Sequence, residues 1–103
     1  MTIVKEEIFG PVLVADRFDD PGEIAATAND SIYGLSAGIW TSDVSKAHRF
    51  AKAIKAGTVW INCFNILDAA LPFGGYKQSG WGREMGHEGL DAYTQTKSVV
   101  AMI

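Results

Sequence analysis

Apolar and polar positions along the first 62 residues follow the periods of short strands and helices. Residues 8–18 alternate between two faces, with Val12, Val14 and Phe18 on one and Leu13, Ala15 and Arg17 on the other. Because successive side chains of a strand point to opposite faces, this two-residue period predicts a strand. Two further apolar runs, over residues 35–41 and 58–62, also predict strands, and the second is rich in β-branched side chains.

Two helices are predicted between these strands. Asp20 can cap the first, Pro21 suits its first turn, and the acidic residue three positions after Asp20 completes a capping box; this helix should end by Gly34. Ser42 is expected to cap the second, and Gly57 to end it in a left-handed conformation. The apolar positions at helical spacing are Val44, Ala47, Phe50, Ala51 and Ile54. Alternating strands and helices predict an α/β fold, a partial parallel sheet with crossover helices.

The last third of the chain has a different character. Residues 65–89 contain Pro72 and six of the chain's 11 glycines, which predicts a long Gly-rich loop, and long loops in domains are usually functional. A short helix is expected over residues 87–93. Residues 98–103 (SVVAMI) are predicted to form a terminal strand, whose apolar edge requires another strand or subunit to cover it.

Composition narrows the class of protein. A chain of 103 residues forms one domain at most. With 12 acidic residues against 9 Lys and Arg, the net charge of −3 excludes the basic surface that nucleic-acid binding requires. No apolar run approaches the roughly 20 residues of a membrane span, and the N-terminus lacks a signal-peptide pattern. A single cysteine, Cys63, favours a reducing compartment, and we expect a cytoplasmic protein.

The sequence offers little that resembles a complete catalytic site. Cys63 follows a predicted strand, with neither His48 nor His87 next to it in sequence, so packing is favoured over catalysis as its role. One Cys and two scattered His match no metal-ligand spacing. The glycines of residues 80–86 miss the spacing of a dinucleotide fingerprint, and residues 74–77 lack the Ser or Thr of a phosphate-binding loop.

Glu7 and Phe9 form the most informative pair. In an extended segment their side chains point to the same face. A carboxylate there can accept two hydroxyl hydrogen bonds beside a flat aromatic surface, which suits a sugar attached to an aromatic heterocycle. The alternative is a solvated acidic pair, Glu6 and Glu7, ahead of a strand, and the residues alone favour that alternative.

Four motifs occur in order along the chain. They are EEIFGPV at residues 6–12, YGL at 33–35, AGTVWIN at 56–62 and PFGGYKQSGWGRE at 72–84, and the segment YTQTKSV follows at 93–99. Together they resemble the C-terminal portion of the NAD(P)-dependent aldehyde dehydrogenase superfamily, over essentially the whole chain. By this resemblance, residues 1–96 correspond to the end of the catalytic domain and residues 97–103 to an oligomerisation strand, which implies a homo-oligomer.

The resemblance also implies roles for individual residues. Glu7 would hydrogen-bond the ribose next to the nicotinamide of NAD or NADP, and Phe9 would pack near the nicotinamide ring, which reverses the preference stated for that pair. Residues 64–73 resemble the loop that lines the aldehyde tunnel, with Leu67 and Phe73 as the expected substrate contacts. The mostly aliphatic residues 66–71 fit an apolar or aromatic aldehyde, and Asp68 leaves room for a cationic aminoaldehyde.

No catalytic residue is assigned to this chain. The family's reaction uses a cysteine nucleophile, an Asn oxyanion donor and a Glu general base, and all three lie upstream of these motifs in the family. The chain is therefore interpreted as a C-terminal fragment, inactive alone, of an enzyme that oxidises an aldehyde to a carboxylic acid. Two alternatives stay open: a self-standing interaction module that pairs through its terminal strand, and a small nucleotide-binding domain without catalysis.

Overall fold

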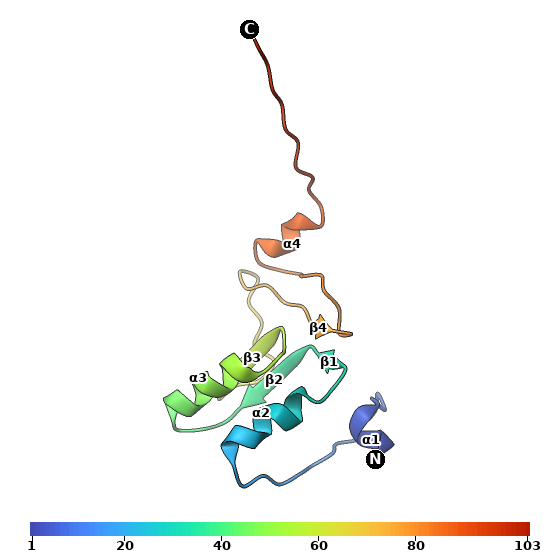
Figure 1. Ribbon diagram of the computed structural model, residues 1–103, viewed down its shortest axis with the longest axis vertical. Helices are drawn as coiled ribbons and strands as arrows, with labels where there is room; N and C mark the ends of the chain where they lie inside the picture. The colour runs from blue at the N-terminus through green and yellow to red at the C-terminus, as the bar shows by residue number, and fades with distance from the viewer.

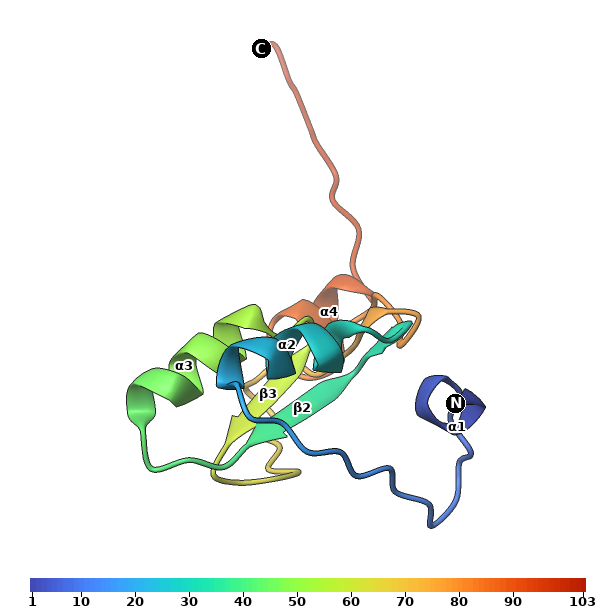
Figure 2. The same cartoon turned by 60° about the horizontal axis from the view of Figure 1, so that its bottom comes forward.

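A parallel strand pair with a crossover helix forms the centre of the chain. The computed structural model describes residues 1–103. Strand β2 (Ser36–Ile39) pairs with β3 (Thr58–Ile61) in register from Ser36 opposite Thr58 to Ile39 opposite Ile61, and helix α3 (Val44–Ala53) connects them. Helices α2 (Pro21–Asn29) and α3 lie on the same side of this pair (Figure 2). The predicted mixture of helices and a parallel sheet is confirmed for this central unit.

Local sequence explains where both long helices begin. The Asp20 carboxylate accepts a hydrogen bond from the backbone N–H of Gly22 at 2.7 Å, and Pro21 opens α2 as predicted. Helix α3 is capped by Asp43, which accepts from the N–H of Lys46 at 3.0 Å, so the prediction of Ser42 as the cap is wrong by one residue. This hydrogen bond to the carboxylate lowers the pKa of Asp43 below its ordinary value.

Tertiary contacts set the ends of these helices. Helix α2 ends at Asn29, before Gly34, because the Asn29 amide donates to the carbonyl of Ala53 at 2.9 Å and accepts from the N–H of Lys55 at 2.8 Å. Helix α3 ends at Ala53, and Gly57 is not left-handed. A Cβ on Gly57 would lie 1.6 Å from the carbonyl oxygen of Gly74, so close backbone approach is what demands a glycine there.

The Gly-rich region folds back on the central unit through short backbone pairings. Strand β4 (Tyr76–Lys77) pairs antiparallel with β1 (Tyr33–Gly34), and Phe73 and Glu84 exchange backbone hydrogen bonds of 2.7 and 2.8 Å. Arg83 donates to the carbonyl of Gly75 at 2.9 Å. Helix α4 (Glu88–Asp91) is a single turn within the range predicted for a short helix. Residues 65–89 thus contain little regular secondary structure, and backbone hydrogen bonds such as those between Phe73 and Glu84 hold them in place.

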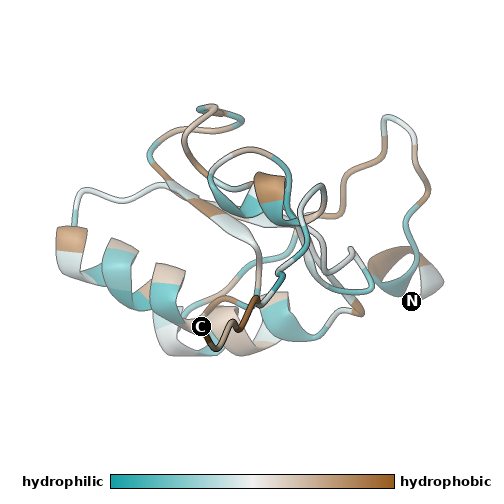
Figure 3. Cartoon of the chain, turned by 90° about the horizontal axis from the view of Figure 1, so that it is seen from above, coloured by the Kyte–Doolittle hydropathy of each residue, from teal (hydrophilic) through white to brown (hydrophobic).

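Neither end of the chain forms its predicted strand. Residues 8–18 lie in irregular chain after helix α1 (Thr2–Lys5), and residues 94–103 extend away from α4 without secondary structure. Figure 1 shows this tail running outward to the C-terminus, and its last residues are strongly hydrophobic in Figure 3. A strand exists only when a neighbour pairs with its backbone, and the single chain supplies none for either segment.

The hydrophobic core is small. The buried apolar residues are Ala47, Ile54 and Trp60. An apolar hollow of about 750 Å³ lies between α2, β2 and α3, with Phe18 and Trp40 in its lining. The radius of gyration is 18.2 Å, against about 13 Å for a compact domain of this length. Much apolar surface is therefore exposed in the single chain. None of its helices has the length and apolar content that crossing a membrane requires.

Candidate functional site

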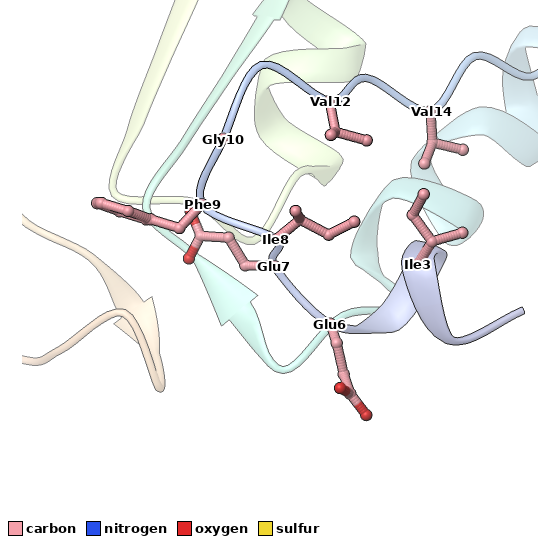
Figure 4. A pocket seen from close by; sticks show the side chains of 8 residues that line it. All are labelled: Ile3, Glu6, Glu7, Ile8, Phe9, Gly10, Val12 and Val14. Atoms are coloured by element: carbon pink, nitrogen blue, oxygen red, sulfur yellow. The ribbon is translucent and has the colours of Figure 1, made fainter.

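The segment from Ile3 to Val14 bends around an open hollow of about 410 Å³. Figure 4 shows the aliphatic side chains of this bend turned toward its inside; they belong to Ile3, Ile8, Val12 and Val14. Glu7 and Phe9 project together to the opposite side, and Glu6 points away from both (Figure 4). The structure therefore brings Glu7 and Phe9 to one side of the segment, as their spacing predicted.

The backbone at Phe9 differs from the extended chain on which that prediction depended. Phe9 has a φ of 55°, in the left-handed region that residues other than glycine seldom adopt. The N–H of Val12 donates to the carbonyl of Gly10 at 2.7 Å, so the chain turns tightly just after Phe9. Phe9 is 91% exposed. Left-handed residues of this kind cluster at ligand-binding sites, where the surroundings hold them in place.

The group that could occupy this surface must match a carboxylate and an aromatic ring. Glu7 forms no side-chain hydrogen bond or ion pair within the chain, so both of its carboxylate oxygens are free to accept hydrogen bonds from a diol. The exposed Phe9 ring beside it offers a flat apolar face for a heterocycle. Free acceptor oxygens beside a flat apolar face fit a ribose attached to an aromatic base.

Lys5 connects this segment to the rest of the fold, a contact that the sequence gave no reason to expect. Its ammonium donates to the carboxylate of Asp30 and, at 3.1 Å, to the backbone carbonyl of the same residue. The Lys5 ammonium lowers the pKa of the Asp30 carboxyl below its ordinary value, chiefly through its hydrogen bond to the Asp30 carboxylate. The partners are 25 positions apart in the sequence, so no local pattern could have paired them.

The proposed substrate residues lie on a loop held by Trp60. The Trp60 indole N–H donates to the carbonyl of Ile66 at 2.9 Å, and its ring meets Phe64 edge-on with centroids 5.1 Å apart. Leu67, one residue further, is 47% exposed. Phe73 is half-buried and lines a hollow of about 770 Å³ in the Gly-rich region. That hollow shares no lining residue with the hollow at Glu7, so Phe73 and the pair Glu7 and Phe9 lie at separate places in this chain.

Other candidate chemistry finds no support in the geometry. Cys63 is a free, half-buried thiol just after β3. No group of three or more His, Cys, Asp and Glu side chains is close enough to hold a metal ion.

Comparison with known proteins gives a consistent result. A model of the aldehyde dehydrogenase family matches residues 1–99. The mitochondrial aldehyde dehydrogenase of Homo sapiens is 50% identical over 103 residues, covering 100% of this chain and 20% of that protein. An aldehyde dehydrogenase of Agaricus bisporus is 56% identical over 99 residues, covering 96% of this chain and 20% of that protein.

Solved structures agree with the sequence relatives. The NAD+ complex of an aldehyde dehydrogenase from Bacillus cereus matches with a TM-score of 0.92 and 60% identity, covering 96% of this chain and 20% of that chain. The chain spans about a fifth of the length of the curated relatives it matches, so it is a fragment relative to them. The motifs, the fold and these matches agree: the chain belongs to the aldehyde dehydrogenase family.

Proposed function

We propose that the chain is the C-terminal part of an NAD(P)-dependent aldehyde dehydrogenase that oxidises an aldehyde to a carboxylic acid through a cysteine thioester. Residues 1–96 would close the catalytic domain, and residues 97–103 would form an oligomerisation strand. The observation that carries the proposal is the pairing of Glu7 with the 91% exposed Phe9 on one side of the first motif. The family membership and the share of the relatives that the chain spans support it.

Glu7 and Phe9 would hold the cofactor in this proposal. The Glu7 carboxylate would accept hydrogen bonds from the hydroxyls of the nicotinamide ribose, and Phe9 would pack against the nicotinamide ring. When bound, the cofactor accepts the hydride that leaves the substrate. NAD is supported by the NAD+ complex of the Bacillus cereus relative, and NADP stays an alternative.

The tunnel loop would select the aldehyde. Leu67, 47% exposed, and the half-buried Phe73 would offer apolar contacts to an aliphatic or aromatic substrate. Asp68 accepts a hydrogen bond from the N–H of Ala70 at 2.8 Å through one carboxylate oxygen. Its second oxygen has no such partner, which keeps a cationic aminoaldehyde as the other substrate class for this loop.

The C-terminal tail would pair with a second copy of the protein. Val99 and Val100 are 79% and 90% exposed, and the residues around them carry unpaired backbone groups. An extended apolar segment of this kind binds by adding a strand to the edge of another sheet. A reducing compartment such as the cytoplasm is proposed because Cys63 is free; the human relative is named as mitochondrial.

Kinetics of a full-length enzyme that carries this chain test the cofactor role. Glu7→Gln keeps the shape of the side chain but removes the charge of the acceptor. Because charge-assisted hydrogen bonds are worth about 1.5–3 kcal/mol, we expect cofactor binding to weaken by about tenfold or more. Glu6→Gln is the matched control, since Glu6 points away from Glu7 and Phe9 (Figure 4) and should leave the kinetics unchanged. If Glu7→Gln changes neither the KM for the cofactor nor kcat, the assignment is wrong.

A further inference from the structure

We propose that the ion pair between Lys5 and Asp30 is a positioning device that holds Glu7 and Phe9 ready for the cofactor. The inference rests on the proposed cofactor role of Glu7 and goes beyond it, because neither Lys5 nor Asp30 touches the ligand. Lys5 lies two residues before Glu7, and Asp30 is the residue that follows α2. The pair therefore connects the cofactor segment with a fixed point of the fold.

Within this chain, residues 1–19 form few contacts with the rest of the fold. Residues 1–19 are all exposed, and their backbone groups form no hydrogen bond with any residue beyond 20. Both hydrogen bonds that join residues 1–19 to the remainder of the fold come from the Lys5 ammonium, and both go to Asp30. Within this chain, the pair is the polar contact that fixes the position of Glu7; the other link to the fold is Phe18, which lines the hollow between α2, β2 and α3.

The receiving end of the pair is firmly held. Asn29, directly before Asp30, is joined to the end of α3 through its hydrogen bonds with Ala53 and Lys55. Lys77 donates to the carbonyls of Asn29 and Ser31 at 2.9 and 2.8 Å, so β4 holds the residues on either side of Asp30. Asp30 is thus fixed by two other elements and provides a stable anchor for Lys5.

The link from Lys5 to the cofactor residues is short. The N–H of Glu6 donates to the carbonyl of Thr2 at 2.9 Å, so the single turn of α1 sets the direction in which the chain leaves Lys5. Only Glu6 separates Lys5 from Glu7. Loss of the pair would lower the fraction of molecules with Glu7 in the binding position, and apparent affinity falls in proportion to that fraction. The effect should appear in the KM for the cofactor, with kcat and the KM for the aldehyde unchanged.

The experiment uses full-length enzyme with the substitutions Lys5→Gln, Asp30→Asn and both together. Exposed ion pairs contribute little individually, so we expect each single variant to raise the KM for NAD by about two- to fivefold. Because each substitution removes the same contact, the double variant should be no worse than either single one. Lys5→Arg, which keeps the charge, should stay close to wild type. Lys52→Gln on α3 is the matched control, since Lys52 forms no hydrogen bond or ion pair within the chain.

Glu7→Gln is measured in parallel to separate the two proposals. If Glu7→Gln raises the KM for NAD while Lys5→Gln and Asp30→Asn behave like Lys52→Gln, the positioning role is wrong and the cofactor role of Glu7 stands. If Glu7→Gln has no effect, both proposals fail. If the effects of Lys5→Gln and Asp30→Asn on the KM for NAD multiply in the double variant, the two residues act separately and the positioning role is wrong. If the KM for the aldehyde rises as much as the KM for NAD, the damage is general and the positioning role is also wrong.

Discussion

Substitution of Gly57 by alanine should destabilise the fold strongly. The added Cβ would lie 1.6 Å from the carbonyl oxygen of Gly74 and 2.7 Å from its carbonyl carbon. An ordinary carbon–oxygen contact is about 3.3 Å, so the Gly74 carbonyl would have to retreat by about 1.7 Å. Gly74 cannot move easily, because the backbone pairing of Phe73 with Glu84 and the Arg83 hydrogen bond to Gly75 hold it on both sides.

The expected magnitude follows from this immobility. Overpacking costs about 1–3 kcal/mol where neighbours can adjust, and here the obstacle is backbone, so we expect about 3 kcal/mol or more for Gly57→Ala. Gly82→Ala is the matched control: no atom lies within 4 Å of its added Cβ and its φ is not positive, so its effect should stay within about 0.5 kcal/mol.

Denaturant titration and soluble yield of the full-length enzyme provide the assay. Gly57→Asn separates the close contact from a requirement for left-handed backbone. Asparagine tolerates the left-handed region, so it would be milder than alanine if conformation were the reason for the glycine. The close contact predicts instead that asparagine is at least as damaging. A Gly57→Ala enzyme as stable as Gly82→Ala, or a Gly57→Asn enzyme more stable than Gly57→Ala, would refute the reasoning.

Three further predictions concern the caps, the tail and the isolated chain. Asp43→Asn keeps a capping side chain but cannot titrate. Because the pKa of Asp43 is lowered in the folded state, the wild-type carboxylate should add stability above its ordinary pKa of 3.8, and this added stability should be lost as the pH falls through the lowered value. Melting temperatures of both proteins against pH will measure the difference. Val100→Asp should reduce the assembly to smaller species by light scattering, whereas Lys97→Gln should not; an unchanged mass contradicts strand pairing. The purified chain should reduce neither NAD nor NADP with any aldehyde, and turnover that disappears in Cys63→Ser would show a nucleophile within it.

Local sequence was sufficient for the elements whose stabilising contacts are close in the chain. Asp20 and Pro21 predicted the start of α2, because a capping carboxylate and a first-turn proline act on the adjacent backbone. The helical spacing of apolar residues predicted α3, and the β-branched run after it predicted β3. The alternation of these elements was enough to indicate a parallel pair, since crossover connections leave few topologies. Glu7 and Phe9 also lie on one side, as predicted, although Phe9 is left-handed and not extended as the prediction assumed.

The tertiary structure decided every feature that depends on a distant partner. Residues 8–18 and 98–103 have the pattern of strands but form none, because no strand within the chain pairs with them. Gly57 is required by the approach of Gly74 rather than by a left-handed helix end, and the hydrogen bonds of Asn29 end α2 early. The pairing of Lys5 with Asp30 is equally invisible in the sequence. Periodicity and capping residues report contacts within a few positions, whereas these contacts exist only once the fold has brought remote segments together.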